Sequence, residues 1–496
     1  MAIGCDTERM GFNRECEGSL MRPAKTALVV FGSSQLSTIV GFIATFYIAR
    51  YFGPSTLGMY AVVTALLFWI HVPASAVDSA LTKRLSEGIN QGAFLSAGFL
   101  TTTALAILVA LGMVVFEGAV NAYVGAPVAR TVAVFVLSWF AAKSVAAALH
   151  GQDKVAAGSL VWTSSRVVRT GSQIALTFLV GLGLTGLIWG HTVSFLTVII
   201  AGLALFDIRP QFPSREKFRS LLKYARYSWL GGISAQAFNW MDTVLLGFFV
   251  SSSLIGIYEV SWTVASTLAI ISTAVKDAVF PSMSRLDAQD RRDEVREYLN
   301  EGLVFAGFFA IPGLIGSLVV GTRVLEIFGP EFGQGGIILL ILITARLSNA
   351  FSAQFQNTLQ AVDRPDLGFR SNAAFIVANL VLNLSLIPIF GWYGAAIATS
   401  LSSVIALLLS YYYVNSVLSE VVFPLTEMGK EVVASLVMIV PVYMLTQAVS
   451  ATTVTTVGIV FAGAAVYLIV VVRISSRIRS NLLSLLPERY QHEWLS

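Results

Sequence analysis

The sequence predicts an all-α polytopic membrane protein with about 14 transmembrane helices and with both termini in the cytoplasm. Hydrophobic residues make up 56% of the chain and charged residues only 12%, a balance typical of membrane helix bundles. Windows of about 19 residues separate that many apolar segments. Lys and Arg fall almost entirely in alternate connections, which the positive-inside rule assigns to the cytoplasm.

The predicted spans are each long enough to cross the hydrocarbon core of a bilayer. In chain order they cover residues 26–49, 57–77, 92–116, 128–149, 158–180, 183–205, 228–250, 255–279, 299–320, 334–359, 372–388, 394–414, 431–449 and 453–472. We interpret them as two six-helix pseudo-symmetric lobes followed by a final helix pair. The corresponding segments are a cytoplasmic N-terminal tail (1–24), an N-lobe (25–206), an amphipathic cytoplasmic linker (207–227), a C-lobe (228–414), a cytoplasmic loop (415–429), spans 13 and 14 (430–472) and a cytoplasmic tail (473–496).

The N-terminal tail carries both cysteines, Cys5 and Cys16. Two cysteines do not complete a metal site, and the cytoplasm keeps thiols reduced, so we expect no metal and no disulfide. The first apolar run is a full span long and lacks a cleavage site of small residues, so we interpret it as the first span instead of a signal peptide.

The linker between spans six and seven has two faces of opposite character. Its apolar face consists of Phe218, Leu221, Leu222 and Ala225. Its basic face consists of Arg215, Arg219, Lys223 and Arg226. This pattern predicts an amphipathic helix that lies on the inner leaflet. The net charge of +4 follows from such cytoplasmic segments and indicates anionic membrane lipids as partners, not nucleic acid.

An internal repeat relates the first half of the chain to the second. The turn segment 46–60 matches 244–258 without a gap, which pairs Gly58 with Gly256. Asp153 and Asp363, each followed by a basic residue, open corresponding spans. Such repeats in transporters are related by an axis along the membrane normal and place a cavity at the lobe interface.

Charged residues inside the spans are the candidates for function, because an arginine at the bilayer centre is costly. Arg166 and Arg169 are three residues apart in span five and therefore share a helix face, which Gln173 continues. Arg346 lies near the middle of span ten with Asn349 on a similar face, and Asn379 belongs to a polar face of span eleven. Facing stripes in opposite lobes would suit a phosphate or diphosphate, since arginine offers forked donors. The alternative is that these arginines pair with carboxylates or carbonyls and hold helices together.

Two in-span carboxylates are candidates for ion coupling or gating. Asp242 lies deep in span seven and is a candidate for binding Na⁺ or a proton, although it could instead neutralise an arginine. Asp78 lies near the inner end of span two, where we expect a gate salt bridge with Lys83 or Arg84. We expect no other cofactor and no catalytic residue.

Six stretches of the sequence match motifs of one transporter family. They are Ala49–Tyr60, Asp242–Gly247, Gly256–Tyr258, Phe280-Pro281, Leu359–Pro365 and Leu382–Thr399. Over residues 25–472 the chain resembles the polysaccharide-transporter branch, the oligosaccharide flippases, of the multidrug/oligosaccharidyl-lipid/polysaccharide flippase superfamily. The resemblance implies alternating access in the cytoplasmic membrane, with a lipid-linked saccharide carried from the inner to the outer leaflet. We expect a monomer.

Two other functions remain open at this point. The first is an ion-coupled multidrug exporter of the related branch, although three in-span arginines disfavour cationic drugs as cargo. The second is a membrane glycosyltransferase or polysaccharide polymerase that uses the same lipid carrier. Such enzymes need catalytic loops or an outer domain, and the outer connections here are short.

Overall fold

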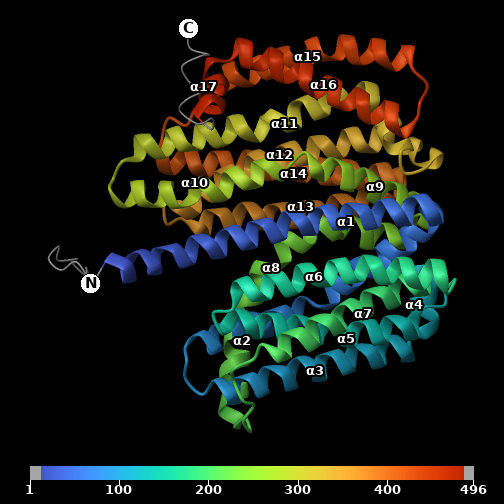
Figure 1. Ribbon diagram of the computed structural model, residues 1–496, viewed down its shortest axis with the longest axis vertical. Helices are drawn as coiled ribbons and strands as arrows, with labels where there is room; N and C mark the ends of the chain where they lie inside the picture. The colour runs from blue at the N-terminus through green and yellow to red at the C-terminus, as the bar shows by residue number, and fades with distance from the viewer. Residues whose placement is uncertain (1–12, 485–496) are drawn as a thin grey trace. The chain divides into compact units, whose positions relative to one another are not determined.

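The computed structural model of the chain describes the backbone of residues 13–484. It also describes their side chains, apart from those of 13–28, 31, 227, 229–235, 270–271, 273–274, 277 and 481–484. Residues 1–12 and 485–496, which hold Cys5 and the ends of both predicted tails, lie outside the described residues. The described chain is helical and contains no strand. Its helices are α1 (Asn13–Ile70), α2 (Val72–Ser86), α3 (Gln91–Val115), α4 (Glu117–Val124), α5 (Ala129–Gly151), α6 (Val155–Ile174), α7 (Gly183–Ala204), α8 (Arg215–Phe249), α9 (Ser252–Thr267), α10 (Ile270–Ala288), α11 (Arg292–Glu326), α12 (Gly336–Ala361), α13 (Pro365–Phe390), α14 (Trp392–Leu418), α15 (Leu425–Ala448), α16 (Thr453–Ile474) and α17 (Ser476–Ser484) (Figure 1).

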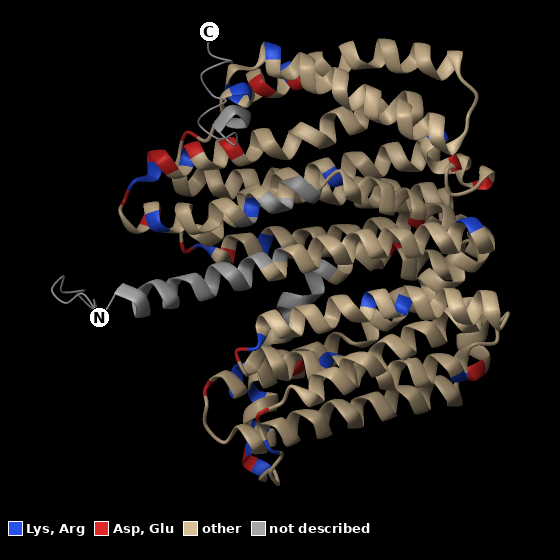
Figure 2. Cartoon of the chain, in the orientation of Figure 1, with Lys and Arg blue, Asp and Glu red and all other residues tan. Residues whose placement is uncertain are grey.

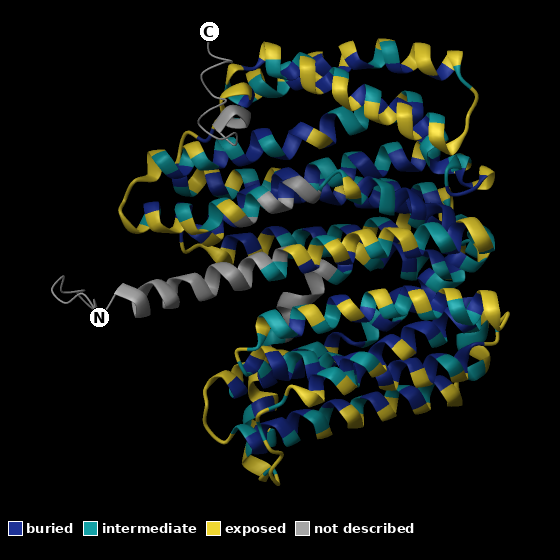
Figure 3. Ribbon diagram, in the orientation of Figure 1, coloured by how far each residue is buried: buried dark blue, intermediate teal, exposed yellow. Residues whose placement is uncertain are grey.

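Ten helices among the described residues are long and apolar enough to cross a membrane. Several of them, such as α13 and α16, leave most of their apolar surface exposed (Figure 3). Val377 and Val381 on α13, and Phe461 and Ile469 on α16, are large exposed hydrophobic side chains of this kind. Apolar surface of this extent is stable only against lipid or another protein. The prediction of a helical, multi-pass membrane protein is therefore confirmed.

The first two predicted spans are joined in α1, which contains a sharp break at Gly53. This residue has φ 75° and ψ 179°, a conformation outside the helical region that glycine adopts without a Cβ clash. Pro54 follows and disfavours a helical conformation at the residue before it. The turn between the two predicted spans therefore lies where the sequence places a Gly-Pro pair.

Three segments differ from the predicted spans. Span two (57–77) is divided, since α1 ends at Ile70 and α2 begins at Val72. The predicted linker helix is continuous with span seven, because α8 runs from Arg215 to Phe249 without a break. Its Leu221 and Ala225 are buried in a cluster with side chains of α2 and α3, so part of the predicted lipid-facing surface is covered by protein. Span eight is interrupted, since α9 ends at Thr267 and α10 begins at Ile270.

The chain divides into two compact units. One unit comprises 1–45 and 66–233, and the other comprises 46–65 and 234–496. Within each unit the charged residues gather mainly at helix ends, and few lie along the middle of the helices (Figure 2). This distribution leaves the charged residues inside the spans as exceptions that need an explanation.

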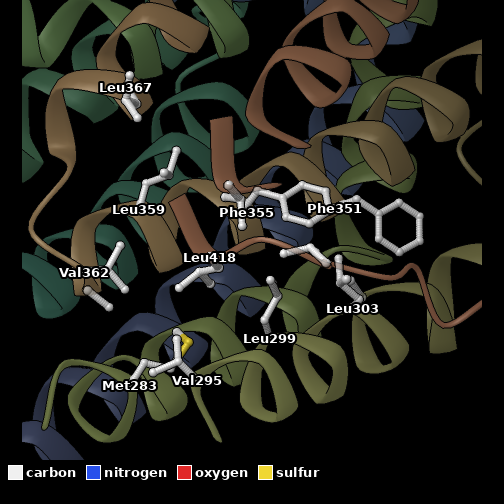
Figure 4. Close-up of a cluster of buried hydrophobic side chains, with 14 of the residues drawn as sticks. Met283, Val295, Leu299, Leu303, Phe351, Phe355, Leu359, Val362, Leu367 and Leu418 are labelled. Atoms are coloured by element: carbon white, nitrogen blue, oxygen red, sulfur yellow. The ribbon is translucent and has the colours of Figure 1, made fainter. Parts of the chain in front are cut away.

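The second unit has a core at the ends of α10, α11, α12 and α14. Met283, Leu299, Phe355 and Leu418 are among its fully or almost fully buried side chains (Figure 4). Contact among apolar side chains from four helices holds those helix ends together. Truncation of any of these side chains is therefore expected to destabilise the second unit.

The two turns that the internal repeat pairs contact one another reciprocally within the second unit. A Cβ atom at Gly58 would lie 1.7 Å from the carbonyl oxygen of Ser252, and one at Gly256 would lie 1.9 Å from that of Pro54. Ser252 and Pro54 are themselves equivalent in the repeat, so the contact has the two-way character of an interface around a twofold axis. Only glycine permits this approach of two backbones.

The Gly256→Ala substitution is expected to destabilise the protein, because its methyl group would meet backbone atoms that cannot move independently. Overpacking of this kind typically costs about 1–3 kcal/mol, so the thermal unfolding temperature of the purified protein should fall. Gly458→Ala is the matched control, since nothing lies within 4 Å of its added Cβ in α16. Equal unfolding temperatures for both variants would contradict the proposed tight contact.

Candidate functional site

Helix α6 of the first unit has a face with two cationic side chains. Arg166 and Arg169 are both half-buried, and the Nη1 of Arg166 donates a long hydrogen bond of 3.4 Å to the carbonyl oxygen of Ser37. The Nε of Arg169 is buried and has no hydrogen-bond partner among the described residues. No described carboxylate lies within ion-pair distance of either guanidinium group. Two cations on one helix thus lack a counter-ion in the described structure.

Lys143 of α5 adds a third cation to this face. Its ammonium group lies 4.3 Å from the ring centre of Trp162, which precedes Arg166 by one helical turn on α6. A second ring, that of Trp139, is 5.3 Å away. Aromatic rings stabilise a cation through their negative faces but do not neutralise its charge. The lysine therefore places a third positively charged group near Arg166.

Gln173 has a different environment from the two arginines. It is buried, and its Nε2 donates a hydrogen bond of 3.0 Å to the carbonyl oxygen of Leu187 on α7. A Cβ at Gly190 would come within 2.6 Å of its Cγ, so α6 and α7 are in close contact here. The amide of Gln173 thus fixes the position of the helix that carries the arginines.

Arg346 of α12, in the second unit, lies against two aromatic rings. Its guanidinium carbon is 3.8 Å from the ring centre of Trp262 on α9 and 4.9 Å from that of Phe238 on α8. Its Nη2 donates a hydrogen bond to Ser266, in the last turn of α9 before the interruption of span eight. The helix C-terminus places partial negative charge near the guanidinium group. No described carboxylate forms an ion pair with it, and its Nε has no described partner.

Asn349 and Asn379 lie in separate places. Asn349 is half-buried on α12, three residues after Arg346. Asn379 is fully buried on α13, and its Nδ2 donates a hydrogen bond of 2.9 Å to the hydroxyl of Thr399 on α14. The structure therefore joins Asn379 to a different group of residues, which surrounds Asp242.

Asp242 is buried at the centre of a polar cluster built from four helices. Its Oδ1 accepts a hydrogen bond of 2.9 Å from Asn383, and its Oδ2 accepts one of 2.6 Å from Thr399. Tyr258 of α9 also donates to Oδ2. No arginine forms an ion pair with Asp242 among the described residues, so it does not neutralise one of the in-span arginines there.

The amide oxygens of Asn379 and Asn383 are both buried and have no described hydrogen-bond partner. Together with the carboxylate and the hydroxyl of Thr399, they supply several oxygen atoms in one small volume. Oxygen ligands of this kind suit hard cations such as Na⁺, and one negative charge matches one positive ion. The cluster can also hold a proton on the carboxylate, because burial without a counter-ion disfavours its charged form.

Asp78 is also buried, in the first unit. Ser144 donates a hydrogen bond of 2.7 Å to its Oδ1, and the Nε2 of His71 lies 3.4 Å from its Oδ2, outside hydrogen-bond geometry. Lys83 and Arg84 instead pair with Glu87 one turn further along α2. The described contacts of Asp78 are thus with a hydroxyl and an imidazole in place of the expected basic residues.

The comparisons with known proteins agree with this architecture. A family model described as "Polysaccharide biosynthesis protein" matches residues 159–333. The probable flippase AglR of Haloferax volcanii is 31% identical over 94% of this chain and 98% of its own length. The probable low-salt glycan biosynthesis flippase Agl15 of the same organism is 28% identical over 84% of this chain and 88% of its own.

Solved structures share the fold at low sequence identity. The lipid II flippase MurJ in an inward closed conformation superposes with a TM-score of 0.72 at 19% identity, over 89% of this chain and 98% of that one. A multidrug resistance transporter of the MATE family in an inward-facing conformation gives a TM-score of 0.64 at 12% identity, over 80% and 98%. The near full-length similarity to AglR shows the family, and the chain belongs to the oligosaccharide flippase branch of the multidrug/oligosaccharidyl-lipid/polysaccharide flippase superfamily, as a multi-pass protein of the cell membrane.

Proposed function

We propose that the protein moves a polyprenyl-phosphate-linked oligosaccharide from the inner to the outer leaflet of the cell membrane by alternating access, without making or breaking a covalent bond. The observation that carries this proposal is a set of half-buried in-span arginines with no described carboxylate partner: Arg166, Arg169 and Arg346. The names of the relatives AglR and Agl15, both called probable flippases, support the same substrate class.

The physical need for such a protein lies in the saccharide. Each hydroxyl group that enters hydrocarbon without a hydrogen-bond partner costs several kcal/mol, so a glycan does not cross a bilayer unaided at a useful rate. The isoprenoid chain has no such barrier and can remain in the lipid. The protein therefore has to supply polar surface for the sugar and the phosphate only.

The arginines are proposed to bind the phosphate or diphosphate. Guanidinium groups donate forked, charge-assisted hydrogen bonds to phosphate oxygens and remain charged inside the membrane. Asn349, close to Arg346, is proposed to add a further donor. Gln173 and Asn379 are proposed to act as positioning residues, since their amides are hydrogen-bonded to neighbouring helices.

Asp242 is proposed to couple transport to a cation, either Na⁺ or a proton. The support is its burial and the two amide oxygens nearby that lack described partners. We further propose about 14 crossings with both termini in the cytoplasm, which follows the positions of the basic residues, and a monomer as the working unit. Asp78 is proposed as a second, gating carboxylate in the first unit.

Reconstitution into proteoliposomes tests the proposed function. A labelled polyprenyl-phosphate oligosaccharide placed in the inner leaflet should become accessible to a membrane-impermeant glycosidase only when the protein is present. In parallel samples without the glycosidase, recovery of the intact lipid-linked sugar would agree with transport, whereas release or extension of the glycan would indicate an enzyme. Protein-dependent movement of a cationic drug without movement of the glycan would instead support the multidrug exporter, whose fold is shared.

A further inference from the structure

A buried carboxylate in the last helix pair has no role in the sites described above. Glu431 of α15 has an exposed fraction of 0%, and neither of its two carboxylate oxygens has a hydrogen-bond partner among the described residues. The hydroxyl group of Tyr467 on α16 is also buried without a described partner. A Cβ at Gly307 of α11 would lie 2.6 Å from the Oε2 of Glu431, so this glycine leaves the space that the carboxylate fills.

The helices around Glu431 contribute apolar side chains to one buried cluster. Val304 and Phe308 of α11, Met438 of its own helix, Val471 of α16 and Ile478 of α17 form one buried cluster there. The three long helices among them, α11, α15 and α16, pack against one another (Figure 1). An ionised carboxylate in such a cluster, with neither a counter-ion nor a hydrogen bond, is strongly unfavourable. Glu431 therefore requires a bound positive species.

The titratable groups that face Glu431 do not supply that positive charge. On α16 the facing group is Tyr467, whose ring lies 5.6 Å from that of Phe308. On α15 the nearest charged group is Glu427, one turn earlier, and it is itself paired with Lys430 at 2.6 Å and hydrogen-bonded by Ser475. The cluster residues of α11 and α17 are uncharged, and Arg477 of α17, next to the cluster residue Ile478 in the chain, acts electrostatically on Glu427.

We propose that Glu431 is a proton-binding site, and that its proton controls how α15 and α16 pack against α11. A proton fits better than a metal ion, because Na⁺ and Ca²⁺ in proteins need about six oxygen ligands and only three polar atoms here lack described partners. No group of three or more His, Cys, Asp or Glu residues that could hold a metal ion occurs among the described residues. A proton alone removes the buried charge.

Proton release would leave a negative charge in the apolar cluster and would favour conformations in which Glu431 reaches water. The Glu427–Lys430 ion pair lies within one turn before Glu431 on α15, and we infer that movement of the helix pair away from α11 would bring the carboxylate to water. Occupancy of the site thus links pH to the position of α15 and α16. This device is separate from Asp242 and does not depend on the identity of the cargo.

Infrared spectroscopy of the purified protein in lipid tests the proposal without any substrate. The spectrum of the native protein minus that of Glu431→Gln should contain the C=O stretching band of a protonated carboxylic acid, shifted in D₂O. The matched control is Glu427→Gln, whose difference spectrum should lack this band. A carboxylate band in its place, or a protonated band that disappears on addition of Na⁺ at constant pH, would overturn the proposal.

The pH dependence of thermal unfolding gives a second readout. The unfolding temperature of the native protein should fall by about 2 °C or more as the pH rises from acidic to alkaline, because the folded state keeps the proposed proton on Glu431 while the unfolded state releases it. Glu431→Gln mimics the neutral acid and should lack this loss. The same pH profile in both proteins would refute the proposed site. If Glu431→Gln fails to fold, Tyr467→Phe is the comparison. Loss of the neighbouring hydroxyl group should shift the infrared band of the protonated Glu431. An unshifted band would count against the proposed proton site.

Discussion

The double substitution of Arg166 and Arg346 by alanine is expected to reduce the rate of glycan flipping in proteoliposomes at least about 100-fold. Hydrogen bonds to charged groups contribute about 1.5–3 kcal/mol each, and each arginine is proposed to make such bonds to the phosphate. Because 1.4 kcal/mol corresponds to a factor of ten, one lost bond at each position already produces this effect. The initial rate of label movement, normalised to the amount of folded protein, is the measurement.

Two controls separate phosphate recognition from general electrostatics. Arg130→Ala removes an exposed arginine that pairs with Glu117, and it should leave the flipping rate unchanged. Arg346→Lys keeps the positive charge but loses the planar fork, so its rate should lie between those of the native protein and Arg346→Ala. A double variant that flips at the native rate would show that these arginines do not bind the cargo.

Asp242→Asn is expected to abolish the dependence of the protein on the coupling cation. In the native protein, increasing Na⁺ should raise the unfolding temperature, since a ligand that binds only the folded state stabilises it by RT ln(1 + [L]/Kd). The amide of the variant cannot balance the charge of the ion, so its unfolding temperature should not respond. Its cation-driven flipping should fall by about tenfold or more, which corresponds to the loss of one charge-assisted contact.

The choice between Na⁺ and a proton is made by the same experiment at two pH values. A response to Na⁺ at constant pH identifies the metal ion, and a response to pH alone identifies the proton. Glu117→Gln is the matched control, because it removes an exposed carboxylate with the same change of charge. An Asp242→Asn protein that still responds to the cation like the native protein would exclude this site.

Much of the fold could be predicted because span length and hydropathy depend on local sequence. The predicted spans 183–205 and 453–472 agree with α7 and α16 almost to the residue. The interruption of span eight could not be predicted, since the stretch between α9 and α10 contains neither proline nor glycine. A tertiary contact that local sequence does not indicate lies beside it, where Arg346 of α12 donates a hydrogen bond to Ser266 at the end of α9.

The candidate site could be predicted only in part. Helical spacing alone indicates that Arg166 and Arg169 share a face, whereas it cannot indicate that Lys143 joins them from α5. The hydrogen-bond partners of Asp242 are likewise distant in sequence, because Thr399 lies on α14 and Asn383 on α13. The four-residue spacing of Asn379 and Asn383 indicates that they share a helix face. That this face meets Asp242 depends on how four helices pack, which the spacing does not indicate.

The reciprocal glycine contact has a consequence for how this chain arose. Had the two halves once been separate copies of one gene product, the ancestral glycine would have faced its own twin across the symmetry axis, and one codon change would have altered both sides together. Fusion into a single chain lets each side change alone, as the equivalent positions Pro54 and Ser252 already illustrate. The glycines themselves do not have that freedom, since each still accommodates the other half's backbone.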